Sequence, residues 1–310
     1  MIIPCRDIDL YARECLWHCK SLDYDDYEII VLPDYTQEDL GGVKVIPTGP
    51  ITPGAKRNIG VANSKGELCA FTDSDAYPRC DWLRNGIKYF EDPMVGAVGG
   101  PGLTPEDDSP RQKASGYVTS SFMVGGLSRR YKTKGLREVD DIHSCNFIAR
   151  RKVLEEVGGW NEDYWPGEDT LMCLAIRRAG YKILEASDVV VYHHRRPLFK
   201  QHLMQVSRFG MHRGFFAKRF GGNSMHLTYF MPSITLIGLV AIGFLTVITD
   251  LVSILLFALI GIYLATAFMA AMQETRDGRI IPMVWVGIVL THLTYGVFFI
   301  AGLIRPELEM

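Results

Sequence analysis

Short apolar runs alternate with amphipathic stretches over roughly the first two hundred residues of the chain. The apolar runs predict strands, and the stretches with a helical period predict the helices between them. The expected strands are 2–3, 27–32, 43–46, 67–72, 95–98, 144–149, 181–186 and 189–192, and the expected helices are 8–21, 53–63, 81–90, 151–157 and 168–179. This alternation predicts an α/β domain with a mostly parallel, Rossmann-like sheet and helices on both faces. Residues 100–141 are rich in Gly, Pro, Ser and charge, and we expect a long active-site loop there.

Three apolar runs follow, at 229–249, 251–272 and 280–304. Each is longer than the roughly 20 residues that a helix needs to cross about 30 Å of hydrocarbon. Only Asp250 separates the first two runs, so this pair forms a very tight hairpin or is shorter and partly re-entrant. The alternative is three buried helices of a soluble core.

Positive charge flanks the apolar runs unevenly. Basic residues before the first run and between the second and third are Arg195, Arg196, Lys200, Arg208, Arg213, Lys218, Arg219, Arg276 and Arg279. The positive-inside rule then predicts a multi-pass protein of the cell (inner) membrane. Its N-terminal domain and the 273–279 loop are expected to be cytoplasmic, with Asp250 and the C-terminus outside. Met1-Ile2-Ile3-Pro4 leads directly into a strand, without the pattern of a signal peptide.

The basic and aromatic segment 197–228 predicts an amphipathic helix that lies on anionic lipid. Three regions are therefore expected: a cytoplasmic domain at 1–196, an interfacial segment at 197–228 and a transmembrane region at 229–304.

The bulk composition excludes several classes of function. A net charge of −2 over 310 residues gives no reason to expect a nucleic-acid partner. No Gly-x-Gly-x-x-Gly follows the first strand, which disfavours a dinucleotide cofactor. The seven scattered cysteines indicate reduced thiols in a cytoplasmic domain. Cys15 and Cys19 have no second pair at zinc spacing, so we expect them in the core of a helix face.

Candidate chemistry begins where the 67–72 strand ends, at Asp73-Ser74-Asp75. Open α/β sheets bind ligands at the carboxyl ends of their strands, and carboxylate oxygens suit Mg²⁺ or Mn²⁺. The simpler interpretation is two solvated turn residues. Glu168 and Asp169 open a later helix, where acidic residues are also ordinary caps.

The order of motifs resembles family 2 glycosyltransferases of the GT-A fold over about residues 1–215. The motifs are Ile3-Pro4, a strand ending at Asp34, Gly54-Ala55-Lys56-Arg57-Asn58-Ile59-Gly60, Asp73-Ser74-Asp75, Gly158-Gly159-Trp160 and Gly167-Glu168-Asp169. The resemblance implies that the nucleotide is bound by Pro4, Arg6, Asp7, Asp34, Lys56, Arg57 and Asp73. Asp34 is followed by Tyr-Thr where Gly-Ser is commoner in the family, which leaves the base open. An ordinary exposed helix face is the alternative for Lys56 and Arg57.

The resemblance also implies a metal site and a catalytic base. Asp75 and Asp73 would hold Mn²⁺ or Mg²⁺ on the diphosphate, completed by His193 or His194. Asp169 would take the proton from the acceptor and Glu168 would position a sugar, although the two roles could be exchanged.

The remaining implied contacts are with the acceptor or the diphosphate. They are assigned to Trp160, Gln205 and Arg208. Gln205-Val206-Ser207-Arg208-Phe209 is similar to the Gln-x-x-Arg-Trp motif of processive polysaccharide synthases, with Phe in place of Trp.

The resemblance implies a membrane-anchored inverting glycosyltransferase. A nucleotide sugar, with UDP favoured, would donate to a lipid-linked acceptor such as a polyprenyl-linked glycan, or to a cell-surface polysaccharide, at the cytoplasmic face. Membrane lipids are further partners, and an oligomer is possible. The alternatives are a processive polysaccharide synthase, a polyprenyl-phosphate sugar synthase and a catalytically silent membrane scaffold.

Overall fold

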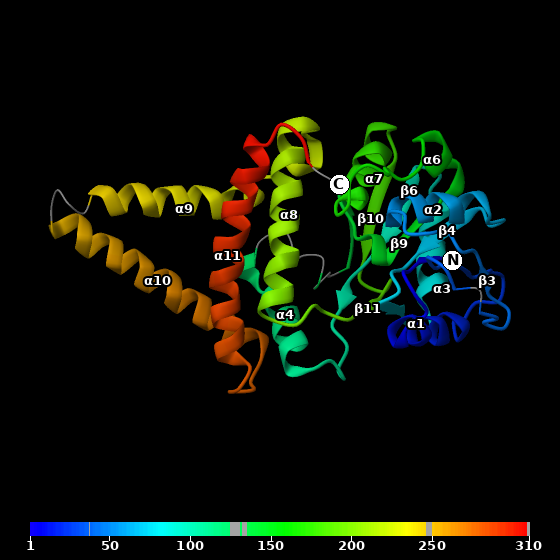
Figure 1. The fold of residues 1–310 in the computed structure, drawn as a ribbon, viewed down its shortest axis with the longest axis horizontal. Coiled ribbons are helices and arrows are strands. Elements are labelled where there is room, and N and C mark those ends of the chain that lie inside the picture. Colours follow the sequence, from blue (N-terminus) through cyan, green and yellow to red (C-terminus); the bar gives the residue numbers. More distant parts are fainter. Residues whose placement is uncertain (37, 125–130, 132–134, 246–249, 309–310) are drawn as a thin grey trace. The chain divides into compact units, whose positions relative to one another are not determined.

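The computed structural model describes residues 1–36, 38–124, 131, 135–245 and 250–308 of the chain (Figure 1). The chain divides into two compact units, and each is described by itself. The sheet unit comprises residues 1–105 and 130–194. The helical unit comprises residues 106–129 and 195–309.

An eight-stranded sheet in the order β3–β2–β1–β4–β9–β6–β10–β8 forms the centre of the sheet unit. Its strands are β1 (Ile2–Pro4), β2 (Ile30–Leu32), β3 (Lys44–Val45), β4 (Leu68–Phe71), β6 (Val95–Gly99), β8 (Leu136–Val139), β9 (Phe147–Arg150) and β10 (Lys182–Ala186). The sheet is mostly parallel, as expected, since β1, β2, β3, β4, β6 and β10 run in one direction and β8 and β9 run against them. Strand β9 starts at Phe147 opposite Gly99, where β6 ends, and therefore runs antiparallel to both β6 and β4.

Helices cover both faces of this sheet. They are α1 (Leu10–Lys20), α2 (Pro53–Ala62), α3 (Trp82–Ile87), α6 (Arg151–Glu156) and α7 (Glu168–Arg178), with 3₁₀ turns η1 (Lys88–Glu91) and η3 (Ser144–Asn146). Alternate residues of β1 enter different cores, since Ile3 packs with α1 and α3 while Ile2 packs with α6 and α7. Helix α2 approaches β1 closely at Gly60, where an added Cβ would lie 2.4 Å from Ile2 Cγ2. The predicted α/β fold class is confirmed.

The sheet unit also contains a second sheet of three short strands. Its order is β5 (Ala76–Pro78), β11 (Val191–His193) and β7 (Gly102–Leu103). Strand β5 begins directly after Asp75, and the apolar pattern did not predict it. This small sheet determines how the candidate site is assembled.

The helical unit contains seven elements among the described residues. They are α4 (Pro110–Ser120), η2 (Phe122–Val124), α8 (Lys200–Arg219), η4 (Gly222–Ser224), α9 (Leu227–Leu245), α10 (Asp250–Glu274) and α11 (Ile281–Ile304). The expectation of one long loop over 100–141 is wrong, because this stretch holds β7, α4 and β8. A capping box formed by Ser109 and Gln112 starts α4. Residues 125–130 and 132–134 of that expected loop lie outside the described residues.

In the part of the chain that the structure describes, three helices are long and apolar enough to cross a membrane: Gly222–Phe244, Asp250–Glu274 and Ile281–Ile304. They correspond to the three apolar runs seen in the sequence. The last four residues of the first run, 246–249, lie outside the described residues. The three candidates differ in burial, since 39% of the apolar window is buried in the third and 6% in each of the others.

Candidate metal and nucleotide site

Asp73 and Asp75 lie in the reversal between β4 and β5. Strand β4 ends at Phe71, and the backbone N–H of Ala76 donates to the carbonyl of Asp73 at 3.0 Å. The chain therefore turns back at the carboxyl edge of the parallel strands β1, β2 and β4. This is the edge at which open α/β sheets bind ligands.

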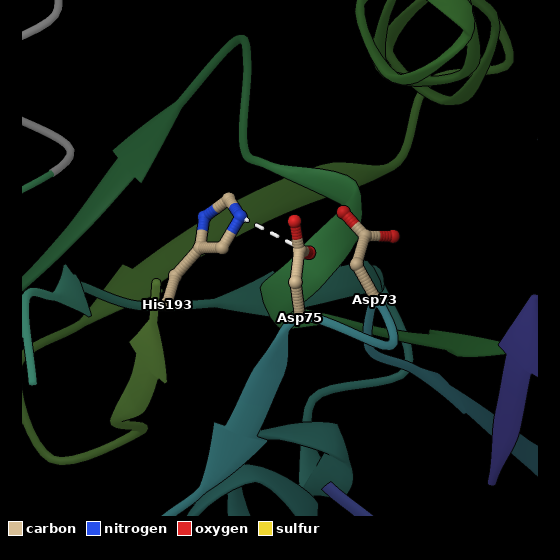
Figure 2. Close-up of side chains that lie close together, drawn as sticks. All are labelled: Asp73, Asp75 and His193. Carbon is tan, nitrogen blue, oxygen red and sulfur yellow. Dashed lines mark ion pairs between the residues drawn. The ribbon is translucent and has the colours of Figure 1, made fainter. Parts of the chain in front are cut away.

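His193 reaches the two aspartates through the pairing of β11 with β5. The two strands are antiparallel, with His193 opposite Ala76 and Tyr192 opposite Tyr77. This register places the imidazole beside the residue that precedes β5, with His193 Nε2 3.4 Å from Asp75 Oδ1. Figure 2 shows the side chains of Asp73, Asp75 and His193 converging on one place.

These three side chains can hold a divalent cation. One ligand atom from each lies within 4.8 Å of the others, and all three residues are half-buried. Two carboxylates and an imidazole form a donor set suited to Mn²⁺, while Mg²⁺ prefers oxygen ligands alone. Burial lowers the pKa of His193, but Cys145 and Asp75 raise it more, so this pKa lies well above its usual range. Asp75 and Cys145 thus favour a positive charge at this place.

His194 lies apart from this cluster. Successive side chains of a strand point to opposite faces, and His194 Nε2 contacts Glu14 Oε2 at 3.0 Å. Its ring also packs 4.5 Å from the ring of Tyr11. Of the two histidines predicted as ligands, the structure brings His193 to the aspartates and pairs His194 with α1.

Arg57 is buried and joins two of the predicted site carboxylates. Its Nη2 donates to Asp73 Oδ1 and its Nη1 donates to Glu168 Oε1, each at 2.7 Å. The guanidinium also lies 4.8 Å from the ring centroid of Trp160. Only 1% of Arg57 and 4% of Glu168 is exposed. The alternative of an ordinary exposed helix face is therefore wrong for Arg57, and its contact with the nucleotide stays a prediction.

Lys56 is buried in the same helix and binds the end of β2. Its Nζ donates to the carbonyl oxygens of Cys5 at 2.6 Å and Leu32 at 3.2 Å, and it forms an ion pair with Asp34. The exposed-face alternative is wrong for Lys56 too. The ammonium fixes Asp34 at the sheet edge, where this carboxylate was predicted to meet the base.

The segment after β1 presents further polar groups at this edge. Asp7 Oδ1 accepts hydrogen bonds from Thr36 Oγ1 at 2.9 Å and from the backbone N–H of Ile8 at 2.8 Å. These two bonds, the Thr36 bond foremost, hold the pKa of Asp7 below its usual range. Arg6 and Asp7 are exposed, whereas Pro4 is buried in β1.

Glu168 and Asp169 differ in their surroundings at the start of α7. Glu168 is buried on Arg57, and its second oxygen accepts from the Gly167 N–H at 3.0 Å. Asp169 is half-buried, and its Oδ1 accepts from the Thr170 N–H at 2.8 Å. The helix N-terminus stabilises both carboxylates. Asp169 is thus the more accessible of the two.

The residues predicted to meet the acceptor or diphosphate lie in different places. Trp160 is 2% exposed and packs between the rings of Phe71 and Phe147, so it supports Arg57 from within the core. This burial does not support a direct contact of Trp160 with an acceptor. Gln205 is half-buried and Arg208 exposed, both on α8 of the helical unit, and their contacts with substrate stay predictions.

The sequence pattern missed Cys145 as part of this site. Its Sγ lies 3.7 Å from His193 Nδ1, behind the nitrogen that faces Asp75. All seven cysteines are free thiols, and Cys15 and Cys19 are buried as expected. No local signal could have paired Cys145 with His193, because η3 and β11 meet only through the fold.

Comparison with known proteins supports the same type of fold. The family model "Glycosyl transferase family 2" matches residues 1–158. The pre-mycofactocin glycosyltransferase of Mycobacterium tuberculosis is 28% identical over 160 residues, which cover 51% of this chain and 33% of that protein. The O-antigen chain rhamnosyltransferase RfbN of Salmonella typhimurium is 31% identical over 161 residues, covering 50% of this chain and 51% of that protein. The chain thus spans between a third and about half of the length of these relatives.

A third relative matches over more of the chain. It is the dolichyl N-acetyl-alpha-D-glucosaminyl phosphate 3-beta-D-2,3-diacetamido-2,3-dideoxy-beta-D-glucuronosyltransferase of Methanococcus voltae. It is 22% identical over 268 residues, covering 79% of this chain and 82% of that protein.

Among solved structures, a mannosyltransferase from Pyrobaculum calidifontis in complex with GDP-Man and Mn²⁺ aligns with a TM-score of 0.63 and 18% identity. The alignment covers 95% of this chain and 85% of that one. At this identity the likeness shows the fold alone.

Proposed function

This chain belongs to glycosyl transferase family 2, and on that premise we propose that it is a membrane-anchored, inverting glycosyltransferase. It moves a sugar from a nucleotide sugar to a lipid-linked or cell-surface polysaccharide acceptor at the cytoplasmic face of the cell membrane. The observation that carries this proposal is the cluster of Asp73, Asp75 and His193 at the carboxyl edge of the sheet. Asp7 and Asp34 lie at the ends of neighbouring parallel strands and extend this edge.

Asp73, Asp75 and His193 are the residues that would hold Mn²⁺ or Mg²⁺. When bound, such a cation neutralises charge on the departing nucleoside diphosphate. The protein prepares the site with Arg57, which fixes Asp73 through a buried hydrogen bond of 2.7 Å. This preorganisation means that Asp73 does not have to be ordered when the donor binds.

Asp34 and Asp7 are the proposed contacts to the nucleoside. Lys56 restrains Asp34, and Thr36 restrains Asp7, so both carboxylates are held in one arrangement. A carboxylate that accepts hydrogen bonds from a base or a ribose selects donors by their pattern of N–H and O–H groups. UDP-sugars are the donor class to test first.

Asp169 is the proposed general base. In an inverting transfer, an acceptor hydroxyl attacks the anomeric carbon as the bond to the diphosphate breaks, and the hydroxyl proton passes to Asp169. Glu168 is unsuited to this task, because its oxygens are bound by Arg57 and by the Gly167 N–H. We assign Glu168 the positioning of the Arg57 and Asp73 pair.

Two observations support a lipid-linked acceptor: the apolar helices of this chain and the name of one relative. Apolar helices long enough to cross a membrane follow the family domain. The Methanococcus voltae relative is named for a dolichyl-linked sugar phosphate, and it matches over 79% of this chain. A polyprenyl-linked glycan is therefore the acceptor class that we propose.

The test is calorimetric titration of UDP, GDP, dTDP and CDP into the detergent-purified full chain, with and without Mn²⁺. We expect tight binding of one nucleotide that depends on Mn²⁺ and falls at least tenfold in Asp75→Asn. Asp26→Asn, in the exposed connection between α1 and β2, is the matched control and should bind like wild type. Absence of binding for all four nucleotides, or equal binding by Asp75→Asn, would contradict the proposal.

A further inference from the structure

Helix α8 runs alongside α11 in the same direction over most of its length. His202 Nε2 lies 2.9 Å from Thr291 Oγ1 near one end, and Lys218 Nζ donates to the Arg305 carbonyl at the other. The sequence offset is 89 residues at the first contact and 87 at the second, so the register hardly changes. The sixteen residue-to-residue steps from 202 to 218 correspond to about 24 Å of parallel contact.

The contact is close because glycines lie at the crossing points. A Cβ added to Gly214 of α8 would lie 2.1 Å from the Phe299 carbonyl oxygen. A Cβ added to Gly302 of α11 would lie 2.0 Å from the Met211 carbonyl oxygen. The two helices therefore pack with their backbones nearly touching, and they must occupy the same depth in any surrounding medium.

Helix α8 carries exposed charge along its entire length. Lys200 begins the helix, Arg208 lies near its middle, and Lys218 and Arg219 end it, all exposed. A helix of 20 residues is about 30 Å long, which is the thickness of the hydrocarbon layer. If α11 crossed the membrane, α8 would cross beside it and place Arg208 near the bilayer centre. An exposed guanidinium at that depth is strongly unfavourable.

Phe298 is exposed on another side of α11, whereas the other exposed large apolar side chains of this helix form one stripe. Its members are Val286, Leu293, Val297 and Ile304, which recur with the spacing of one helix face. Neighbours cover other parts of α11, including Ala267 and Ala271 of α10 and Phe230 of α9. A helix with one apolar stripe and one charged companion has the pattern of an element that lies in the membrane surface.

Helices α9 and α10 are different. Both extend away from α11, splayed apart near it and approaching each other farther out, in yellow and orange in Figure 1. Ser233 Oγ of α9 donates to the Gly296 carbonyl of α11 at 2.9 Å. Ala267 and Ala271, near the C-terminal end of α10, are buried in a core shared with α11. Large apolar side chains are exposed in between: Ile234, Ile237, Val240, Phe244, Leu251, Ile254, Leu255, Phe257, Leu259 and Ile262. Asp250 is the only Asp, Glu, Lys, Arg or His residue from 229 to 273.

We propose that α9 and α10 alone enter the bilayer, as a hairpin, while α8 and α11 lie together on its surface. The apolar stripe of α11 faces the hydrocarbon, and the basic residues of α8 face anionic headgroups. The two chain ends then lie on the same side of the membrane. This arrangement replaces the three crossings expected from hydropathy, and it does not depend on the transferase proposal.

The first test locates the two chain ends in the full-length protein. Epitope tags are placed before Met1, after Met310 and, as a control, between Arg276 and Asp277, and protease access is compared in sealed right-side-out and inverted membrane vesicles. We expect all three tags to be cleaved in vesicles of the same orientation. A C-terminal tag protected where the other two are cleaved indicates three crossings and would overturn the proposal.

A matched pair of charged variants provides a second, independent test. Ile262 and Leu293 are exposed residues near the middle of α10 and α11, respectively. Lysine at a surface-lying helix can direct its ammonium to the headgroups, whereas lysine inside the hydrocarbon cannot do so readily. We expect Ile262→Lys to lower the carbonate-resistant membrane fraction several-fold and Leu293→Lys to change it less than twofold. Equal losses in the two variants would contradict the proposal.

Discussion

The two units of this protein differ in how much apolar surface they expose and in how their buried polar groups are partnered. The sheet unit buries charged side chains, such as Arg57 with Asp73 and Glu168, and surrounds them with partners. The helical unit exposes apolar side chains on α9 and α10, and its buried polar residues form hydrogen bonds such as that between Ser115 and His202 at 2.7 Å. The difference indicates that the units are adapted to different solvents, because water makes exposed apolar surface costly and hydrocarbon makes unpaired charge costly.

Buried polar groups also serve different purposes in the two units. In the sheet unit, the buried ions lie at the sheet edge and restrain carboxylates predicted to bind the donor. In the helical unit, Ser115, His202 and Thr291 connect α4, α8 and α11 through neutral hydrogen bonds of 2.7 and 2.9 Å. Preorganised charge prepares a site for reaction, while a satisfied neutral network fixes how helices pack.

The largest effect is expected at the proposed base. Asp169→Asn should lower transfer to a hydroxyl acceptor by about 10²–10⁴-fold, because proton removal by a positioned carboxylate contributes that much. Donor binding should remain within threefold of wild type. Initial rates with a lipid-linked acceptor, combined with nucleotide calorimetry, provide the measurement.

The exposed Asp163→Asn, on the loop before α7, is the control for this substitution. An unchanged rate in Asp169→Asn would remove the residue from the role of base. It would also favour a phosphate acceptor, which is already ionised and requires no base.

Arg57 tests whether the buried charges of the sheet unit depend on one another. Arg57→Met leaves Asp73 and Glu168 without their shared cation, and breaking such a buried pair costs about 3–5 kcal/mol. We expect a large fall in the free energy of unfolding, measured by thermal or denaturant melts. The control Lys152→Ala removes an exposed cation of α6 and should change stability by less than about 0.5 kcal/mol. An Arg57→Met protein as stable as wild type would contradict this prediction, because it would show that Asp73 and Glu168 do not require the guanidinium.

Two glycines test whether close helix packing is confined to the α8–α11 pair. Gly214→Ala places a methyl group 2.1 Å from the Phe299 carbonyl oxygen and should destabilise the protein by about 1–3 kcal/mol. Gly261→Ala on α10 is the matched variant, since no atom lies within 4 Å of its added Cβ. Its stability in detergent should equal or exceed wild type, because alanine favours the helix. Equal destabilisation by the two variants would contradict the close contact.

His202 gives the smallest expected effect, seen as a dependence of stability on pH. Burial first, and the charge of Arg195 second, lower the pKa of His202 to about 4. In the unfolded chain the imidazole binds a proton near pH 6.5. The contribution of His202 to the free energy of unfolding is therefore complete above that pH and is lost as the pH falls toward 4. Between pH 7 and pH 5 wild type should lose about 1–2 kcal/mol more than His202→Gln. The measurement is a pair of melting curves for each protein at the two pH values. Equal pH-dependent losses in wild type and His202→Gln would contradict the prediction and would show that His202 is protonated within the fold.

The sequence predicted those features that depend on local pattern. The order of strands and helices followed from apolar periodicity, and the Asp73 and Asp75 pair followed from its place after an apolar strand. The three apolar helices followed from length and hydropathy, and the confirmed family resemblance followed from spaced motifs.

The features that could not be predicted depend on distant contacts. Strand β5 has three residues, one of them Pro78, which gives no periodic signal. Helix α4 buries only small groups such as Ala114 and Val118, so its sequence has the composition of a loop. Lys56 and Arg57 look like an exposed helix face, because the carboxylates that bind them come from other strands and helices. The choice between His193 and His194 likewise depends on the register of β11 with β5.

The pairing of β11 with β5 affects how the protein is made. His193 is 118 residues beyond Asp75 in the chain. A ribosome that adds about 5–20 residues per second needs several seconds to synthesise that interval. Throughout that time the nascent chain holds Asp73 and Asp75 without His193. The three side chains that could hold a cation therefore come together only after the last strand has been made.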